Sequence, residues 1–401
     1  MSDNSAIYDV VVVGGGPAGA TAACDLARAG KRVVLLDRAG RIKPCGGAIP
    51  PRAIRDFAIP DSMLVAKINA ARMISPANAE VDMPIDGGFV GMVDREHFDE
   101  WLRQRAATVG AERRTGTFKR FSRDEAGVNT VHYDERQPDG STAERTVRSR
   151  AIIGADGAVS GVARQFLKDA DRVPFVFAYH EIIKAPTPEQ RAAYESRRCD
   201  VYYQGHVSPD FYGWVFPHGQ TVSVGTGSMH KGFSLRDSVA ELRKATGLDE
   251  VETIRKEGAP IPLHPLPRWD DGHSVLLAGD AAGVVAPASG EGIYYALLGG
   301  RLAAEAVEEF LQTADAKALK LARKRFMRGN GSVFRILGLM QWYWYANDKR
   351  REQFVSICRD KDVQKLTWDS YMNKRLVKAK PMAHVRIFFK NLAHMTGLAS
   401  A

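Results

Sequence analysis

The stretch Ile7–Gly19, IYDVVVVGGGPAG, constrains the fold of this chain more than any other. Its β-branched run Val10–Val13 predicts a strand buried on both faces, which is typical of a parallel sheet. The run stops at three consecutive glycines, and Gly14, Gly16 and Gly19 match the pattern G-x-G-x-x-G. In that pattern the first glycine permits a tight turn, the second lets a pyrophosphate approach the backbone, and the third lets helix pack on strand.

The context of these glycines favours a phosphate site over a turn that binds nothing. A helix is expected from Ala18 to Ala29, and its N-terminus would offer free N–H groups and a positive dipole end to phosphate. A second strand, Val33–Leu36, ends at Asp37, where a carboxylate can bind a ribose hydroxyl. We predict a dinucleotide here, and its position at the extreme N-terminus favours FAD over a transient nicotinamide. The predicted contacts are Gly14, Gly16, Pro17, Ala18, Gly19, Asp37 and Arg38.

Two later strands end in the same way. Ala151–Ile153 is followed by Gly-Ala-Asp-Gly with Asp156, and Ser274–Ala278 is followed by Gly279 and Asp280. Carboxylates at the ends of parallel strands meet at one edge of a sheet, so both are expected to contact the same cofactor. The segment after Asp280 predicts a helix whose N-terminus could face a flavin ring. Its candidate cofactor contacts are Gly290, Gly292 and Ile293, with Glu291 positioning the flavin or a water.

Two other stretches carry candidate residues. The loop Arg41–Pro51 is rich in proline and glycine, so regular structure is not expected there. Cys45, Gly46 and Gly47 would let the backbone pass close to a flat ligand, although a simple connector is the alternative. A helix is expected to begin after Asp94, and Arg95 in its first turn is unfavourable for the helix dipole. Arg95 therefore indicates either an anionic partner, for which we predict the FAD, or a solvated surface arginine.

The order of predicted elements gives an α/β fold with a Rossmann-like FAD-binding domain and an inserted antiparallel β-sheet. Residues 68–93 and 174–267 are expected to form that substrate-binding sheet, interrupted by a helix over Leu235–Thr246. Its aromatic residues could line an apolar ligand site or simply form core. The FAD-binding domain would be discontinuous, and a basic helical C-terminal region would close the chain. Their expected ranges are 1–67, 94–173 and 268–312 for the first and 313–401 for the second.

Composition narrows the class of protein. The 401 residues are 45% hydrophobic, which supports a large core. Four cysteines without a C-x-x-C pair indicate neither a disulfide framework nor a metal site. Because no apolar run reaches about 18 residues and no signal peptide precedes the first strand, a cytoplasmic protein is expected.

The positive charge is concentrated in the C-terminal region. Residues 313–401 carry 19 basic and 6 acidic residues, a net charge of +13. The remainder carries 37 basic and 41 acidic residues, a net charge of −4. Within this basic region, aromatic residues cluster at 341–345, and at 385–390 they lie beside Arg386 and Lys390, as at a bilayer interface. We expect peripheral contact with an anionic membrane and no nucleic-acid partner, the alternative being a helical cap whose aromatics pack on the sheet.

Together these motifs resemble the FAD-dependent monooxygenase-like flavoprotein superfamily over roughly the first three quarters of the chain. Three further motifs narrow the resemblance. Pro44–Gly47 (PCGG), Tyr212–Pro217 (YGWVFP) and Ala288–Ile293 (ASGEGI) are similar to signatures of geranylgeranyl reductases. With the basic aromatic tail, they most resemble the chlorophyll and bacteriochlorophyll branch, although the spacing in the first motif is tighter.

The resemblance implies stepwise reduction of three double bonds of a geranylgeranyl chain, giving phytyl. The substrate would be geranylgeranyl diphosphate or the geranylgeranyl ester of a (bacterio)chlorophyll, with partner enzymes of pigment synthesis. NADPH would reduce FAD, or ferredoxin would; no second G-x-G-x-x-G follows a strand.

The expected catalytic residues are Cys45, Tyr212, Trp214 and Glu291. The aromatic side chains would stabilise positive charge, and Cys45 or Tyr212 would relay a proton. The alternatives are an aromatic-ring monooxygenase and a non-catalytic prenyl-binding escort.

Overall fold

The computed structural model describes residues 6–38, 42–168, 170, 173–190 and 194–374. The chain divides into two compact units, each built from three segments. Unit 1 comprises residues 1–43, 95–175 and 260–334, and unit 2 comprises residues 44–94, 176–259 and 335–401. This division differs from the predicted one, because the Cys45 loop belongs with the substrate sheet and the C-terminal region is shared between the units.

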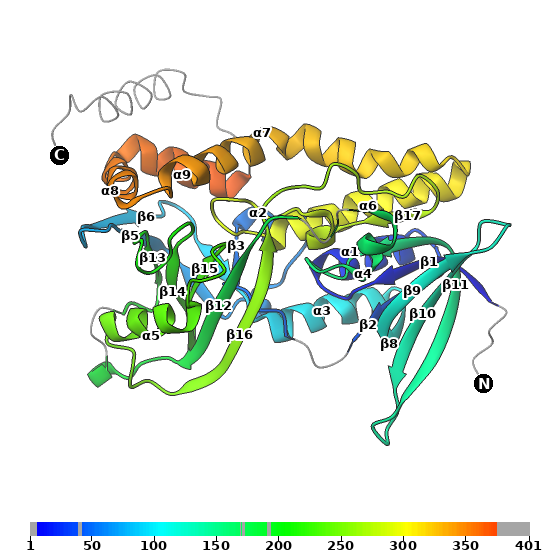
Figure 1. The fold of residues 1–401 in the computed structure, drawn as a ribbon, viewed down its shortest axis with the longest axis horizontal. Coiled ribbons are helices and arrows are strands. Elements are labelled where there is room, and N and C mark those ends of the chain that lie inside the picture. Colours follow the sequence, from blue (N-terminus) through cyan, green and yellow to red (C-terminus); the bar gives the residue numbers. More distant parts are fainter. Residues whose placement is uncertain (1–5, 39–41, 169, 171–172, 191–193, 375–401) are drawn as a thin grey trace. The chain divides into compact units, whose positions relative to one another are not determined.

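Unit 1 is built on a seven-stranded sheet of order β8-β2-β1-β11-β10-β9, with β17 beside β11 (Figure 1). The strands are β1 (Ile7–Val13), β2 (Val33–Asp37), β8 (Glu112–Thr115), β9 (Thr117–Arg123), β10 (Asn129–Arg136), β11 (Thr142–Gly154) and β17 (Val275–Leu277). β8, β2, β1, β11 and β17 pair in parallel, and β9, β10 and β11 pair antiparallel. The α/β class predicted from the glycine pattern is confirmed.

Strand β11 takes part in both kinds of pairing. Its first part pairs antiparallel with β10, from Thr142 to Ser149, and its later part pairs in parallel with β1, from Arg148 to Gly154. The sequence predicted a strand over Ala151–Ile153. That segment is the end of a longer strand, because no glycine or proline interrupts the run from Thr142 to Ile153.

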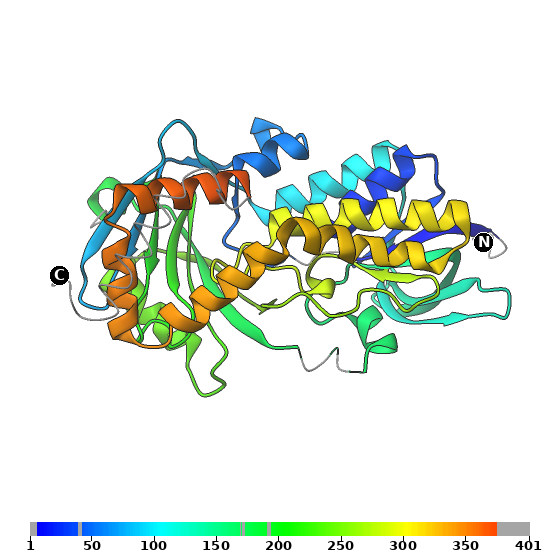
Figure 2. The same ribbon diagram turned by 90° about the horizontal axis from the view of Figure 1, so that it is seen from above.

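The helices of unit 1 lie along this sheet. They are α1 (Pro17–Arg28), α3 (Arg95–Thr108), α4 (Gly161–Phe166), α6 (Ile293–Thr313) and the first part of α7 (Lys320–Trp344), with the short helices η3 (Gly279–Ala282) and η4 (Ala316–Leu319). Figure 2 shows α6 running alongside the first half of α7. Helices α1 and α6 approach closely because Gly300 has no side chain; a Cβ there would lie 2.1 Å from the Ala18 carbonyl oxygen.

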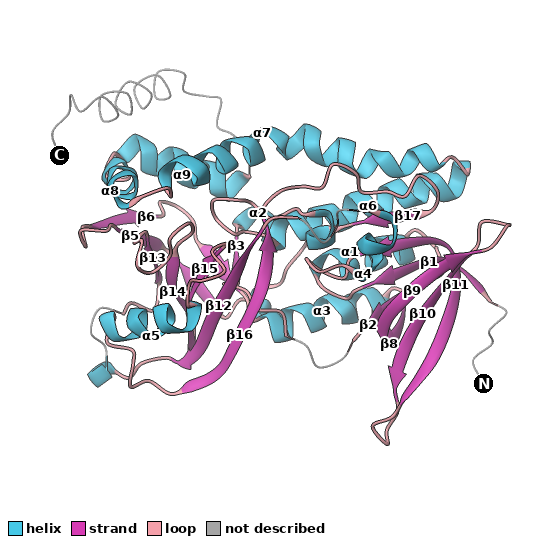
Figure 3. Cartoon of the chain, in the orientation of Figure 1, coloured by secondary structure: helices cyan, strands magenta, loops and turns pink. Residues whose placement is uncertain are grey.

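Unit 2 is built on a second seven-stranded sheet of order β16-β12-β15-β14-β13-β5-β6 (Figure 3). Its strands are β5 (Ala70–Ile74), β6 (Glu80–Pro84), β12 (Phe175–Lys184), β13 (Arg198–Tyr202), β14 (Gly213–His218), β15 (Thr221–Ser228) and β16 (Thr253–Pro262). The predicted antiparallel character holds for the β12–β15, β14–β15, β13–β14 and β5–β6 pairs, whereas β13 and β5 run parallel. A three-stranded sheet, β3 (Ala48–Ile49), β7 (Val90–Met92) and β4 (Ala66–Ile68), accompanies it.

Helices cover the unit 2 sheet through two apolar clusters. Helix α5 (Leu235–Ala245) contributes Val239 and Leu242 to a cluster with Val215 and Val224 of the sheet. Residues Trp368, Tyr371 and Met372 of α9 pack on a second cluster, which includes Ile68 and Met92 and against which Phe216 of β14 also packs. The remaining helices of the unit are α2 (Pro51–Asp56), η1 (Asp61–Met63), η2 (Pro188–Gln190), α8 (Asp348–Ile357) and α9 (Lys361–Asn373). The C-terminal helices are therefore packed structure, as the cap alternative expects.

Candidate functional site: a dinucleotide edge and an aromatic sheet

Four neighbouring parallel strands of unit 1 end level with one another. Val13 of β1 pairs with Leu36 of β2 and with Gly154 of β11, and Gly154 pairs with Leu277 of β17. The predicted cofactor residues that follow these strands therefore share one carboxyl edge. Such an edge is where parallel α/β sheets bind ligands.

The three glycines of the first turn have three different surroundings. Gly14 has φ +103°, and a Cβ there would lie 2.3 Å from the Ala155 carbonyl oxygen. A Cβ at Gly19 would lie 1.8 Å from the Gly14 carbonyl oxygen, so this glycine lets helix pack on strand. A Cβ at Gly16 would meet nothing within 4 Å. No side chain caps α1, which begins at Pro17. Open space in front of an uncapped helix N-terminus fits a pyrophosphate.

Asp37 lies at the end of β2, where the ribose contact is expected. Its Oδ2 forms an ion pair with Arg103 Nη1 of α3 at 3.3 Å, and the same nitrogen donates to the Gly15 carbonyl oxygen at 3.3 Å. Burial raises the pKa of Asp37, and Arg103 opposes that shift. Arg38 is exposed, and its amide donates to Asp37 at 2.8 Å. Sequence reasoning missed Arg103, because nothing in its local pattern distinguishes it from other helical arginines.

The other predicted carboxylates of this edge already have partners within unit 1. Asp156 accepts hydrogen bonds from the Ser160 hydroxyl at 2.5 Å and the Gly161 amide at 2.7 Å, so it helps to cap α4. Burial raises the pKa of Asp156, and these hydrogen bonds oppose the shift. Asp280 forms an ion pair with Lys43. Glu291 Oε1 accepts from the Tyr294 amide at 2.9 Å, at the start of α6. Their contact with a cofactor stays a prediction.

The turn before α6 has the shape that its glycines require. Gly290 has φ +62°, and its amide donates to the Ala286 carbonyl at 2.9 Å. Gly292 precedes the helix without a side-chain cap of its own, and Ile293 is buried. A flavin facing this helix start would therefore meet backbone and the Glu291 carboxylate together.

Arg95 has an internal anionic partner. Its Nε and Nη2 donate to the two carboxylate oxygens of Asp99 at 2.8 and 2.7 Å, and both side chains are largely buried. This i,i+4 pair explains how α3 tolerates an arginine in its first turn. The solvated-surface alternative is wrong for Arg95, and its contact with FAD stays a prediction.

In unit 2 the Cys45 loop lies on strand β14. A Cβ at Gly46 would be 3.2 Å from the Phe216 ring, and one at Gly47 would be 2.4 Å from His218 Nε2. Gly47 has φ +72°, and its amide lies 3.4 Å from Cys45 Sγ. Two motifs far apart in sequence, PCGG and YGWVFP, thus meet in one unit.

One face of β14 carries an aromatic row. The ring centroids of Tyr212 and Trp214 are 6.0 Å apart, and those of Trp214 and Phe216 are 6.2 Å apart. Val215, between them in sequence, points to the α5 cluster on the opposite face. Burial raises the pKa of Tyr212, and neighbouring Tyr345 and Cys45 add to the shift. The sheet therefore presents an apolar, aromatic face beside the Cys45 loop.

The aromatic segment 341–345 is divided between interior and surface. Tyr345 is buried against Tyr203 at a centroid distance of 5.4 Å, whereas Trp342 is 70% exposed. No helix within the described part of the chain is long and apolar enough to cross a membrane. The second predicted interface segment, 385–390, lies outside the described residues.

Other residues around the aromatic row were not predicted. A Cβ at Gly225 would lie 2.3 Å from the Trp214 ring, and Ser223 accepts a hydrogen bond from the Trp214 indole N–H at 3.0 Å. His218 follows the row on the same strand. The only sequence signal was the glycine-rich strand VSVGTGS, in which Gly225 precedes Gly227 by two positions.

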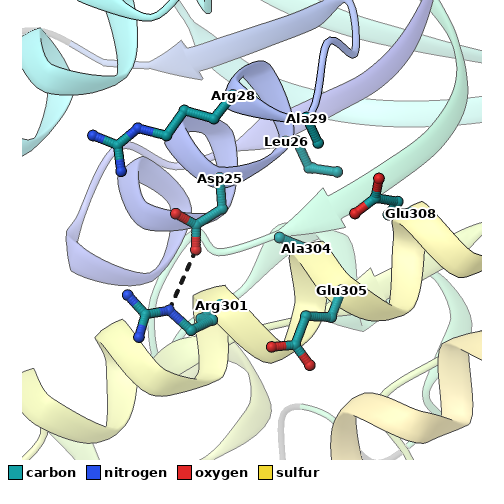
Figure 4. Close-up of a pocket in the computed structure, with 8 residues that line it drawn as sticks. All are labelled: Asp25, Leu26, Arg28, Ala29, Arg301, Ala304, Glu305 and Glu308. Atoms are coloured by element: carbon teal, nitrogen blue, oxygen red, sulfur yellow. Dashed lines mark ion pairs between the residues drawn. The ribbon is translucent and has the colours of Figure 1, made fainter. Parts of the chain in front are cut away.

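A charged surface cavity of about 430 Å³ lies between α1 and α6 (Figure 4). Asp25 and Arg301 form an ion pair across it at 3.5 Å, and Glu308 pairs with Lys31 at 3.9 Å. Its α1 residues begin at Asp25, nine positions from Gly16 and about 14 Å along the helix. The cavity is therefore not the phosphate site.

The comparisons with known proteins agree with these features. Residues 7–327 match the family model of the FAD binding domain. Geranylgeranyl diphosphate reductase of Rhodobacter capsulatus is 60% identical over 391 residues, covering 98% of each chain. The chain belongs to the geranylgeranyl reductase family. The reductase of the same name from Synechocystis is 38% identical, covering 97% of this chain and 98% of that one.

Solved structures share the fold of this reductase family member. A geranylgeranyl bacteriochlorophyll reductase-like protein from Thermoplasma acidophilum has a TM-score of 0.79 at 22% identity, covering 94% of this chain and 99% of its own. A p-nitrophenol 4-monooxygenase from Pseudomonas putida has a TM-score of 0.66 at 15% identity, covering 93% of this chain and 99% of its own. At these identities the likeness concerns the fold, which reductases and monooxygenases have in common. The predicted family is confirmed by the closer relatives.

Proposed function

We propose that this chain is an FAD-dependent reductase that saturates three double bonds of a geranylgeranyl chain to give phytyl. The observation that carries the proposal is the packing of the Cys45 loop on the aromatic row of β14, in a chain 60% identical to a geranylgeranyl diphosphate reductase. No specific observation favours a monooxygenase, whose fold alone is shared. A non-catalytic escort would need neither the thiol nor the glycine edge.

The glycine edge of unit 1 fits FAD. Gly16 and the uncapped start of α1 would hold the pyrophosphate, Asp37 a ribose, and Asp280 the ribityl chain. When bound and reduced by the electron donor, FAD would supply the hydride for alkene reduction. Glu291 would act by ordering the start of α6 through its bond to the Tyr294 amide. Gly290, Gly292 and Ile293 would let this helix start approach the ring.

The aromatic row of unit 2 would hold the prenyl chain and stabilise the positive charge that develops on its carbons during reduction. An isolated alkene has no carbonyl to accept charge, so proton delivery gives its carbons cationic character. The π faces of Tyr212 and Trp214 would stabilise that charge. Burial raises the pKa of Tyr212, so its phenol is protonated at neutral pH, although it is a weaker acid than a free phenol. Tyr212 is the first candidate for proton relay because it lies in the aromatic row. Cys45, on the loop beside this row, is the second candidate for proton relay.

The test is anaerobic incubation of purified enzyme with reductant and geranylgeranyl substrate, followed by mass analysis. Wild type should yield products that have gained two, four and six hydrogens. Cys45→Ala and Tyr212→Phe should each lower turnover at least tenfold with normal FAD content, a typical general acid–base effect. Cys358→Ala and Tyr343→Phe, which alter residues of the C-terminal helices, are the controls. Full turnover of both site variants would refute the assigned roles, and no mass gain would refute the reductase.

The electron donor in this proposal is NADPH, bound transiently because only one dinucleotide turn follows a strand. Stopped-flow bleaching of flavin absorbance should be fast with NADPH and slow with NADH. If reduced ferredoxin bleaches the flavin faster than NADPH does, ferredoxin is the electron donor and the NADPH assignment is wrong. Running the mass assay with the free diphosphate and with the pigment ester identifies the better substrate.

We also place a membrane contact on α7. Ile336, Leu339 and Trp342 are 42, 61 and 70% exposed and recur every three residues, so they share one helix face. Such a face, in the net +13 C-terminal region, suits an anionic lipid surface. The enzyme would thus be cytoplasmic and peripheral, near partner enzymes of pigment synthesis. Flotation with anionic vesicles should exceed that with neutral ones, and serine at all three positions should abolish it; unchanged flotation would refute the contact.

A further inference from the structure

We propose that Ser223, His180 and Glu257 are positioning residues that fix the indole of Trp214 through one continuous chain of hydrogen bonds. The catalytic consequence rests on the proposed function, in which Trp214 lines the prenyl chain. The chain of bonds itself does not depend on that function. It lies wholly within unit 2.

The geometry of the chain is regular. The Trp214 indole N–H donates to Ser223 Oγ at 3.0 Å. The same hydroxyl lies 2.9 Å from His180 Nδ1, and His180 Nε2 lies 3.0 Å from Glu257 Oε2. Glu257 Oε1 in turn lies 2.8 Å from Arg255 Nε. Every link has normal hydrogen-bond length.

The donors and acceptors can be ordered in only one way when His180 is neutral and Glu257 ionised. A carboxylate only accepts, so His180 Nε2–H must donate to Glu257. Nδ1 then carries the lone pair and accepts from the Ser223 O–H. The Ser223 oxygen remains free to accept from the indole N–H of Trp214. The direction of the whole chain is therefore set by the charged end at Glu257 and Arg255.

Packing reinforces the hydrogen bonds. Ser223, His180 and Trp214 are 0, 3 and 6% exposed. Gly225 leaves room for the indole to lie on strand β15, because a Cβ there would be 2.3 Å from its ring and 2.6 Å from the His180 Cβ. The only polar atom of Trp214 is thus turned toward the sheet. What the residue offers to a ligand is its π surface, the part that stabilises positive charge.

A serine beside a histidine and a carboxylate also resembles a hydrolase triad. Here the Ser223 hydroxyl is fully buried and already engaged by the Trp214 indole. A nucleophile must reach its substrate, so this serine acts on the orientation of Trp214.

The test observes Trp214 directly. The protein contains six tryptophans, so 5-fluorotryptophan labelling should give six fluorine resonances, and Trp214→Phe identifies one of them. In Ser223→Ala that resonance should shift and broaden, whereas Ser223→Thr, which keeps the hydroxyl, should restore it. The matched control is Ser238→Ala, which removes another buried serine hydroxyl of the unit, bonded to the Val207 carbonyl at 2.7 Å.

The kinetic readout separates positioning from general structure. Ser223→Ala should lower kcat about fivefold, the rate equivalent of one neutral hydrogen bond, with FAD content unchanged and KM nearly so. If Ser223→Ala does not fold, His180→Phe removes both ring nitrogens and serves instead. An unmoved Trp214 resonance would overturn the hydrogen-bond chain. A moved resonance with full kcat would overturn the positioning role and leave the proposed function intact. A wild-type enzyme that reduces no prenyl substrate would overturn the proposed function and the catalytic consequence together. The Trp214 resonance would still report on the chain of hydrogen bonds.

Discussion

The two units build their candidate sites in opposite ways. In unit 1 the predicted cofactor residues follow the ends of parallel strands, and their roles depend on backbone shape: a turn at Gly14, open space at Gly16, close packing at Gly19. In unit 2 the candidate residues meet through side chains from a loop at Cys45 and strands at 212–225. Backbone sites are fixed by local sequence, whereas the aromatic site depends on long-range packing. Substitutions should therefore separate cofactor binding from turnover.

The largest effect is expected at the glycine turn of unit 1. Gly19→Ala puts a Cβ 1.8 Å from backbone, so it should cost about 3 kcal/mol or more in unfolding free energy. Gly16→Ala meets no protein atom, so it should keep apo-protein stability and lose bound flavin. Flavin absorbance per protein and urea denaturation check both, with Gly329→Ala, which also meets nothing, as control. Normal flavin content in Gly16→Ala would break the assignment of this turn.

A smaller effect with the opposite signature is expected at Gly225 of unit 2. Its Cβ would collide with Trp214 and His180, so Gly225→Ala should cost about 1 to 3 kcal/mol of stability. The FAD content of the folded variant should stay normal, and prenyl turnover should fall. Gly232→Ala, at an open position of the same unit, should leave stability, FAD content and turnover unchanged. Loss of flavin in Gly225→Ala would contradict the separation between the units.

The third effect appears only on acidification. Burial lowers the pKa of His218 from its usual 6.5 to about 4, so the folded protein disfavours the charged ring. The unfolded chain takes up this proton as pH falls below about 6.5. Stability is thus complete above that pH and lost toward pH 4, by about 1 to 2 kcal/mol between pH 7 and 5. Urea midpoints for wild type and His218→Gln should converge on acidification; midpoints that differ by the same amount at every pH would contradict this.

The smallest effect on stability is expected on the exposed face of α7. Serine at Ile336, Leu339 and Trp342 should change unfolding free energy by less than about 0.5 kcal/mol per site, because these side chains are largely solvated. Only vesicle binding should respond. Ile254→Ser, at another exposed apolar position of unit 2, should leave both properties unchanged. A large loss of stability would show that the face is packed in solution.

The sequence predicts unit 1 well because its signals are local. The strand and glycines of Ile7–Gly19, the strand ending at Asp37, and the strand before Gly279 appear where expected. What it could not predict is how polar side chains are satisfied. Asp156 caps α4, Arg95 pairs with Asp99, and Arg103 reaches Asp37 from another helix. These partners are set by tertiary packing, which produces no periodic pattern in the sequence.

In unit 2 the sequence predicts the strands and their aromatic residues but not their partners. Trp214 and Phe216 alternate along β14, and Tyr212 directly precedes that strand, so their shared face follows from strand geometry. That Gly46 contacts Phe216, and that Ser223 and His180 hold Trp214, required the fold of distant segments. Individual catalytic roles remain predictions for the same reason.

The double pairing of β11 has a consequence for how the protein is made. Ile7 of β1 pairs with Arg148 of β11, and Leu277 of β17 pairs with Gly154, so each partner is separated by well over a hundred residues. Both intervening stretches include segments of unit 2. On the ribosome, β1 must wait for β11 to emerge, and β11 must wait for β17. Pairings of such long range fold slowly and meanwhile leave one edge of β1 and one edge of β11 unpaired, although β2 and β10 can already pair with the other edges. We therefore expect the nascent chain to depend on chaperones until residue 277 has left the exit tunnel.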